Sequence, residues 1–286
     1  FRSRAGIERL NEMQRRAHSW IAARRSLLIV APTGSGKTEA ALLPALNALI
    51  ASGGDAVRIL YVTPLRALNR NLMERVYRLV ADTGLTAAVR HGDTPASERR
   101  KQAAHPPDIL ITTPETLQAI LPGKVLQRHL RNVRFVIIDE VHQFAEDRRG
   151  VQLAVALERL RRITEKDFQR IGLSATVGHP EQIAALFGGE RPLEILLSPL
   201  EKKMEYHVEW PRPLDKDFET ARDLYITPEA AASLSEIDDT LDESRSTLVF
   251  VNARPLAELL GSRLAMVRTD VGVHHGSLPR EERERV

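Results

Sequence analysis

Apolar and polar positions follow two periods along this chain, and the two alternate in a regular order. Short continuous apolar runs are typical of strands buried on both faces of a sheet, and apolar residues every three to four positions are typical of amphipathic helices. The runs predict strands at 27–30, 57–62, 86–90, 108–111, 134–139 and 170–173. Helical spacing predicts helices at 7–23, 65–81 and 151–163, and others that begin after residue 38 and at residue 114. This order predicts an α/β fold, a parallel sheet with helices on both faces.

The alternation is interrupted after residue 200. Several prolines break the pattern, and residues 201–243 carry 13 acidic side chains against five basic ones. Beyond this stretch, apolar runs at 247–251 and 271–273, with a helical stretch between them, predict that the strand–helix order begins again. The sequence therefore predicts three parts: a first domain at 1–200, an acidic connecting segment at 201–244, and the beginning of a second α/β domain at 245–286.

Composition narrows the class of protein. With 43% hydrophobic and 28% charged residues, the chain has enough apolar side chains for a buried core. No run approaches the roughly 18 apolar residues of a membrane helix, no signal-peptide core follows the first residues, and there is no cysteine. These absences favour a cytoplasmic protein without a membrane partner. The net charge is only +3, but outside the acidic stretch the chain is basic, which permits a polyanionic partner.

The segment between the first strand and the next helix has the form of a phosphate-binding loop. Residues 31–38 read Ala-Pro-Thr-Gly-Ser-Gly-Lys-Thr, with Ala31 in place of the usual first glycine. The glycines allow successive backbone N–H groups to point inward at the positive end of the helix, Lys37 is placed to reach the β- and γ-phosphates, and the Thr38 hydroxyl is placed to bind Mg²⁺. An ordinary strand-to-helix turn is the alternative, but Gly-Lys-Thr after an apolar strand favours a nucleotide site. The predicted nucleotide-binding residues are Thr33, Gly34, Ser35, Gly36, Lys37 and Thr38.

Two acids follow the buried strand at 134–139. Asp139 lies at the carboxyl edge of the predicted sheet with the phosphate loop, so it is placed to hold Mg²⁺ through water, and Glu140 to polarise the attacking water. With Lys37 they are the predicted catalytic residues, against the alternative of two acids that end a strand by chance. His142 follows at once and taken alone is more often structural. After the next strand, small polar residues could hydrogen-bond to His142 or Asp139 and report the nucleotide state, or could form a plain polar turn: Ser174, Ala175 and Thr176.

Three further strand ends carry hydroxyl or glycine residues that open helices or turns. Hydroxyls, backbone N–H groups and helix N-termini in this arrangement suit the phosphates of a polymer, although each site also reads as a helix cap that needs no ligand. Three such sites at one sheet edge favour a strand-shaped ligand. The candidate nucleic-acid contacts are Thr63, Pro64, Arg66, Gly92, Thr94, Thr113 and Pro114.

Taken in order, these segments resemble the motifs of superfamily 2 helicases over almost the whole chain, with motifs I, Ia, Ib, II and III at 31–38, 63–68, 113–117, 139–142 and 174–176. Within this superfamily the chain is most similar to the Lhr (large helicase-related) group, on segments such as Glu-Asp-Arg-Arg-Gly-Val-Gln-Leu at 146–153 and Gly-Leu-Ser-Ala-Thr-Val-Gly at 172–178. The resemblance assigns Gln14 to the adenine edge. It assigns further nucleic-acid contacts to Asn252, Arg254, His275 and Gly276.

The resemblance implies a RecA-like P-loop NTPase domain followed by the start of a second RecA-like domain, with ATP and Mg²⁺ as cofactors. It also implies 3′–5′ movement on single-stranded DNA or an RNA–DNA hybrid, in DNA repair or related processing. A nucleoid-associated protein of prokaryotic source is expected from the same resemblance. Motifs V and VI of the family would lie after Val286, so the sequence is interpreted as a fragment, and residues 1–286 are expected to bind ATP but to hydrolyse it slowly.

Two other hypotheses remain open at this point. One is a nucleic-acid-stimulated ATPase that remodels or senses a strand without unwinding it. The other is a nucleic-acid-binding module whose nucleotide pocket is only structural, and Glu140 argues against it because a passive module needs no carboxylate beside Asp139.

Overall fold

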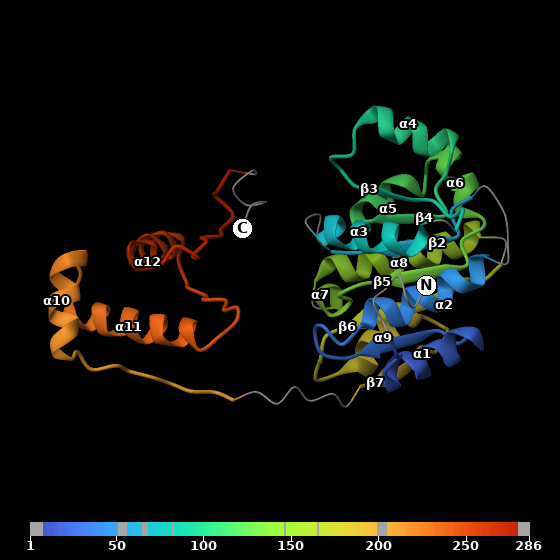
Figure 1. The fold of residues 1–286 in the computed structure, drawn as a ribbon. Coiled ribbons are helices and arrows are strands. Elements are labelled where there is room, and N and C mark those ends of the chain that lie inside the picture. The colour runs from blue at the N-terminus through green and yellow to red at the C-terminus, as the bar shows by residue number, and fades with distance from the viewer. Residues whose placement is uncertain are drawn as a thin grey trace. The chain divides into compact units, whose positions relative to one another are not determined.

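The computed structural model describes residues 8–50, 56–64, 68–81, 83–145, 147–164, 166–198 and 205–279, and Figure 1 shows its helices and strands. The chain divides into two compact units, 1–203 and 204–286, which are described separately below. Within the described ranges, none of the helices is both long enough and apolar enough to cross a membrane.

The first unit is built on a seven-stranded sheet in the order β3-β4-β2-β5-β6-β1-β7, and all of its strand pairs are parallel. The six predicted strands are present with ends shifted by two residues at most, and the seventh, β7, was not predicted because its side chains are only partly buried. The strands are β1 (Leu27–Val30), β2 (Ile59–Val62), β3 (Ala87–Arg90), β4 (Ile109–Thr112), β5 (Phe135–Ile138), β6 (Gln169–Ser174) and β7 (Glu194–Leu197).

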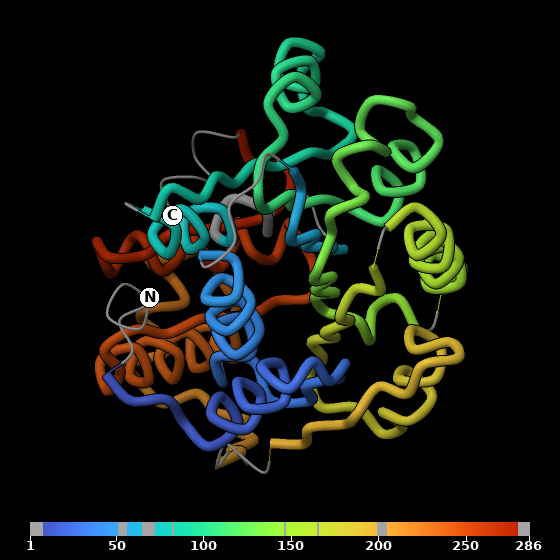
Figure 2. Tube along the Cα trace, turned by 90° about the vertical axis from the view of Figure 1, so that its right-hand side faces the viewer, coloured from blue at the N-terminus to red at the C-terminus, as the bar shows by residue number. Residues whose placement is uncertain are grey.

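Helices cover both faces of this sheet, as the pattern predicted (Figures 1 and 2). The short helices α4, α6, α7 and α9 were not predicted, since each is too short to show a clear helical period. The helices are α1 (Glu12–Ala22), α2 (Lys37–Ile50), α3 (Leu68–Val80), α4 (Ala96–Ala104), α5 (Pro114–Ile120), α6 (Lys124–Leu130), α7 (His142–Ala145), α8 (Arg148–Ile163) and α9 (Pro180–Gly188).

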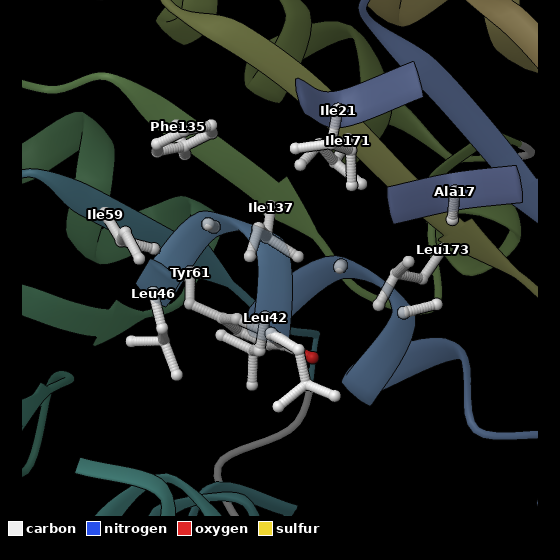
Figure 3. Close-up of a cluster of buried hydrophobic side chains, with 14 of the residues drawn as sticks. Ala17, Ile21, Leu42, Leu46, Ile59, Tyr61, Phe135, Ile137, Ile171 and Leu173 are labelled. Carbon is white, nitrogen blue, oxygen red and sulfur yellow. The ribbon is translucent and has the colours of Figure 1, made fainter. Parts of the chain in front are cut away.

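The core lies in two layers because successive strand residues point to opposite faces. In β1, Leu27 and Ile29 join a cluster with α1, α2 and α3, whereas Leu28 and Val30 join a second cluster with α5, α6, α8 and α9. Figure 3 shows the first layer, in which Leu42 of α2 lies over side chains from the central strands. Full burial of a side chain such as leucine contributes about 1.5–3 kcal/mol to the free energy of folding. The two buried layers therefore fix the positions of the strand ends at which the candidate site lies.

The described residues of the second unit form three helices around a small core. The helices are α10 (Asp215–Leu224), α11 (Pro228–Asp242) and α12 (Arg254–Val267), and Leu224, Leu234 and Leu264 form the buried cluster between them. Helices α10 and α11 lie inside the stretch 201–244, where Pro228 is the first residue of α11 and Thr227 caps it.

The strands predicted at 247–251 and 271–273 do not form in the described part of the second unit, so that prediction was wrong. Leu248 is 80% exposed and Phe250 88% exposed. An apolar run becomes a strand only where a neighbouring strand pairs with its backbone, and neither run has such a partner among the described residues of this unit.

Candidate nucleotide site

The loop between β1 and α2 has the backbone of a phosphate cradle. Gly34 and Gly36 adopt positive φ angles of +76° and +84°, which favour glycine, and α2 begins at Lys37. A Cβ atom on Gly36 would lie 2.4 Å from the side-chain nitrogen of Gln14. The loop is held to the next strand by the N–H of Ala31, which donates to the carbonyl of Ser174 at 3.1 Å.

Helix α1 braces this loop from the side. The side chain of Asn11 caps α1 and donates to the carbonyl of Ser35 at 3.0 Å. Gln14 donates to the carbonyl of Gly36 at 3.3 Å and accepts from the backbone N–H of Asn11 at 3.1 Å. Gln14 is buried, and both its amide nitrogen and its amide oxygen already have hydrogen-bond partners within the protein. Recognition of an adenine by Gln14 stays a prediction. Asn11 was not singled out in the sequence, although an Asn three residues before a Gln is the signal of a capping box.

Lys37 is held back on its own loop in this structure. Its Nζ donates to the carbonyls of Ala31 at 2.7 Å and Pro32 at 3.0 Å. Burial lowers the pKa of Lys37, and the charges of Glu140 and Asp139 oppose this effect. The three predicted catalytic side chains are therefore close enough for their charges to influence one another. A bound phosphate would replace the loop carbonyls as the partner of the Lys37 ammonium.

Asp139 sits immediately after β5, where both of its carboxylate oxygens accept hydrogen bonds. Oδ2 accepts from the hydroxyl of Tyr61 at 2.7 Å, and Oδ1 accepts from the N–H of Glu140 at 3.0 Å. Burial raises the pKa of Asp139, while the Tyr61 and Glu140 hydrogen bonds and the charge of Lys37 act in the opposite direction. The protein thus keeps a carboxylate in a place that disfavours its charge, an arrangement typical of functional sites.

Tyr61 is a site residue that the sequence analysis missed. It is fully buried in β2 on the α2 side of the sheet (Figure 3), and the side chain of Thr38 acts to lower the pKa of its hydroxyl. Burial, followed by the charge of Asp139, raises its pKa well above the usual value, so the hydroxyl stays protonated as a donor. Tyr61 therefore holds Asp139, one of the two residues predicted to bind Mg²⁺, and is influenced by the other, Thr38. The only sequence signal was a tyrosine in a buried run, whose hydroxyl must find a partner.

Glu140 and His142 face each other beside the motif at the end of β6. Glu140 has a positive φ of +46°, an uncommon backbone conformation for a non-glycine residue that points to a functional constraint. His142 Nε2 lies 3.5 Å from Glu140 Oε2, and His142 Nδ1 accepts from the N–H of Ala175 at 3.3 Å, with Ser174 Oγ at 3.4 Å. Because Nδ1 is the acceptor, Nε2 carries the ring proton and faces Glu140. Thr176 is exposed.

The candidate nucleic-acid contacts of the first unit lie at the ends of β2, β3 and β4, at the same edge of the sheet as Asp139. Two of their hydroxyls serve local structure, since Thr113 caps α5 and Thr94 accepts from the N–H of His91 at 2.9 Å. The hydroxyl of Thr63, a residue only 1% exposed, is buried without a hydrogen-bond partner among the described residues. Gly92 is exposed, Pro114 is the first residue of α5, and the carbonyl of Pro64 accepts from Arg149 at 3.2 Å. Arg66 lies outside the described residues. Contact of these residues with a polymer stays a prediction.

The remaining predicted contacts belong to the second unit. Arg254, the first residue of α12, donates to Ser277 Oγ at 2.7 Å, and His275 hydrogen-bonds with Glu258. Asn252 and Gly276 are exposed. These contacts bring the segments 252–254 and 275–277 together at the start of α12.

The donor set fits a magnesium ion shared with a nucleotide. Among the described residues, no group of three or more His, Asp or Glu side chains forms a metal-binding cluster. Mg²⁺ usually binds one or two carboxylates or hydroxyls together with water and phosphate oxygens, and Thr38 and Asp139 supply that number. The Ser35 hydroxyl is buried in the loop without a hydrogen-bond partner, as expected of a group that waits for a ligand.

Comparison with known proteins identifies the family of the chain. The sequence model of the DEAD/DEAH box helicase family matches residues 11–183, which contain the loop, the acid pair and the segment after β6. The chain is 40% identical over 280 residues to the Lhr helicase/uracil glycosylase of Escherichia coli, covering 86% of this chain and 18% of that protein. It is 37% identical over 307 residues to the ATP-dependent helicase Lhr-Core of Methanothermobacter thermautotrophicus, covering 98% and 35%.

A solved structure, Mycobacterium smegmatis helicase Lhr bound to ssDNA and AMP-PNP, matches with a TM-score of 0.75 and 36% identity. The match covers 98% of this chain and 38% of that one. The RecA-like sheet and the likeness to Lhr helicases predicted from the motifs are thus confirmed. The chain spans about a fifth of the length of the bacterial relatives and about a third of the archaeal ones.

Proposed function

Because this chain belongs to the DEAD/DEAH box helicase family, we propose that it is the ATP-hydrolysing part of an Lhr-type helicase or translocase that moves 3′ to 5′ on single-stranded DNA or an RNA–DNA hybrid. DNA repair or related processing is its proposed setting. One observation supports the ATPase: Asp139, whose carboxylate accepts from the Tyr61 hydroxyl, and Glu140 both lie close enough to Lys37 of the phosphate loop for their charges to act on it.

Each of these residues has its own role in the reaction, in which ATP and water give ADP and phosphate. The N–H groups of residues 34–38 and the ammonium of Lys37 bind the β- and γ-phosphates, with Lys37 leaving the carbonyls of Ala31 and Pro32. Glu140 orients the attacking water and accepts its proton, while the Nε2–H of His142 holds the Glu140 carboxylate. Thr38 and Asp139 would hold Mg²⁺, which would supply positive charge to neutralise the phosphate oxygens. Such positioning and charge neutralisation are the main sources of catalysis in phosphoryl transfer.

The nucleic-acid part of the proposal rests on placement and on likeness. The ends of β2, β3 and β4 present turns and the N-terminus of α5 at the same sheet edge as the nucleotide site, and ligands of parallel α/β sheets bind at that edge. The similar Lhr structure is bound to ssDNA and AMP-PNP. The polarity, the hybrid substrate and the repair role come from the family resemblance.

The first test is ATP hydrolysis by a polypeptide that extends past Val286, measured with and without single-stranded DNA and RNA. Glu140→Gln removes the proton acceptor, so we expect hydrolysis to fall at least about 100-fold while ATP binding persists. Glu181→Gln, an exposed acid in the first turn of α9, is the matched control and should hydrolyse ATP normally. Equal hydrolysis by Glu140→Gln and the unchanged protein would contradict the assigned role.

Strand displacement and ATP hydrolysis by the same polypeptide distinguish a helicase from the alternative functions. Strand-stimulated hydrolysis with displacement of a paired strand supports a helicase. Stimulation without displacement supports an ATPase that remodels or senses a strand. Hydrolysis that neither polymer stimulates would contradict both and would indicate a nucleotide switch with another partner.

A further inference from the structure

Arg149, in the first turn of α8, contacts three segments that are far apart in the sequence. Its Nε donates to Glu115 Oε1 at 2.7 Å and its Nη2 donates to the carbonyl of Pro64 at 3.2 Å. Its guanidinium also lies over the ring of Phe144, 5.4 Å from the ring centre. Pro64 follows β2, Glu115 is in the first turn of α5, and Phe144 is in α7. One side chain thus joins two proposed nucleic-acid segments to the helix that follows the acid pair.

The position of Arg149 relative to Phe144 is fixed by the backbone. A Cβ atom on Gly150 would lie 2.0 Å from the carbonyl oxygen of Phe144 and 2.8 Å from its carbonyl carbon, so only glycine allows α7 and α8 to approach this closely. The N–H of Gly150 donates to the carbonyl of Asp147 at 2.9 Å, and the N–H of Asp147 donates to the carbonyl of Phe144 at 3.3 Å. A shift of α7 would therefore carry Arg149 with it.

At its other end, α7 is tied to the catalytic residues. Its first residue, His142, faces the Glu140 carboxylate and the N–H of Ala175. The N–H of Gln143 donates to the carbonyl of Glu140 at 2.9 Å, and the N–H of Phe144 donates to the carbonyl of Val141 at 3.1 Å. Within the described residues 139–145 and 147–150, these backbone hydrogen bonds link the acids proposed to act on ATP to the turn that carries Arg149.

Stability does not explain this arrangement. The Arg149 side chain is 35% exposed and that of Glu115 54% exposed, and ion pairs of this kind contribute only about 0–1 kcal/mol to folding. Burial acts to raise the pKa of Glu115, but hydrogen bonds from Arg149, its own backbone and Thr113 outweigh burial and leave that pKa below its usual value. Glu115 is thus a charged partner for Arg149 throughout the neutral range.

We propose that Arg149 is a positioning residue that transmits the state of the nucleotide site to the two strand-binding segments at Pro64 and Glu115. This inference rests on the proposed function. A guanidinium suits the role because its planar fork can donate to a carboxylate and a carbonyl at once while its face lies on an aromatic ring, which a lysine ammonium cannot do. Movement of α7 when ATP binds or is hydrolysed would then change the spacing of the two segments and with it the grip on the strand.

The test measures coupling rather than activity alone. The affinity of the full-length protein for fluorescent single-stranded DNA is measured by anisotropy with and without AMP-PNP, for the unchanged protein, Arg149→Ala, Arg149→Lys and Arg148→Ala. Arg148 is exposed in the same helical turn, so its substitution removes the same charge as a matched control. Couplings between two sites usually change affinity about 5–150-fold.

We expect AMP-PNP to change DNA affinity about tenfold or more in the unchanged protein and in Arg148→Ala, and less than about threefold in Arg149→Ala, with Arg149→Lys between them. A purely structural role would alter both affinities equally and leave their ratio unchanged, and that result would overturn the proposal. If Arg149→Ala does not fold, Glu115→Gln provides the same comparison, with a smaller loss of coupling expected. An unchanged protein that fails to bind DNA, or binds it without regard to nucleotide, would instead contradict the proposed function, and Arg149 would have nothing to couple.

Discussion

At the scale of single residues, two opposing effects act on the charge of Asp139. Burial disfavours its charge, and the Tyr61 hydroxyl and the Glu140 N–H compensate by donating to its two oxygens. Both donors favour the charged form of this buried carboxylate, which is the form that binds a cation. The sequence identified Asp139 by its place after a strand but not Tyr61, because a tyrosine in an apolar run looks like core until the fold shows what its hydroxyl contacts.

Tyr61→Phe tests this environment while keeping the aromatic ring. We expect the Mg²⁺ concentration for half-maximal binding of a fluorescent ATP analogue to rise severalfold, and the free energy of unfolding to fall by about 1–3 kcal/mol, because Asp139 loses a donor. The Tyr61 hydrogen bond lowers the pKa of Asp139, so its loss raises that pKa. Asp139 then loses its proton only at a higher pH. The acid limb of the pH profile of ATP hydrolysis should therefore shift to higher pH.

The control for this change is Tyr77→Phe, which removes a hydroxyl from a side chain that is 52% exposed on α3. It should leave the Mg²⁺ dependence and the pH profile in place. Identical Mg²⁺ titrations and pH profiles for Tyr61→Phe and the unchanged protein would show that Tyr61 does not position Asp139.

At the scale of elements, the site depends on how α1, α2 and α7 meet the carboxyl edge of the sheet. The periodicity predicted α1 and the start of α2, because amphipathic spacing and a glycine-bearing turn are local signals. It did not predict that α1 would brace the phosphate loop, since the hydrogen bond from Asn11 to the Ser35 carbonyl joins residues 24 positions apart. The strands at 247–251 and 271–273 were wrongly predicted for a related reason, because an apolar run does not reveal whether a pairing strand is present.

Asn11→Ala tests the brace. It removes the cap of α1 and the bond to Ser35, and we expect the free energy of unfolding to fall by about 0.5–2 kcal/mol and the affinity for a fluorescent ATP analogue to fall severalfold. Thr227→Ala removes the equivalent cap of α11 in the second unit and should leave nucleotide affinity unchanged. If both variants bind nucleotide as tightly as the unchanged protein, Asn11 caps α1 but does not support the phosphate loop.

At the scale of the whole molecule, the two units differ sharply in their cores. The first has two extensive buried layers on a seven-stranded sheet, whereas the buried cluster of the second contains three leucines. Residues 8–198 also hold every described residue of the proposed nucleotide site. The first unit therefore has what it needs to fold by itself.

A polypeptide of residues 1–203 should consequently unfold cooperatively at nearly the same temperature as residues 1–286. We expect a difference of less than about 3 °C in the main transition, followed by circular dichroism, because 1 kcal/mol shifts the midpoint of a domain of this size by about 2–4 °C. Binding of a fluorescent ATP analogue should confirm that the phosphate loop is intact. A shorter chain that fails to fold would show that the first unit depends on the second.

The sequence by itself determined the α/β class, six of the seven strands, the phosphate loop and the acid pair, because these features are encoded in residues that are neighbours in the chain. Short apolar runs, glycines and a Gly-Lys-Thr step act through local backbone geometry. The tertiary structure alone decided that Tyr61 donates to Asp139, that Asn11 donates to the carbonyl of Ser35, and that Arg149 contacts three segments. Each of these contacts joins residues brought together by the parallel sheet and the packing of helices on it, and no local pattern specifies which distant side chain a buried or bridging polar group will meet.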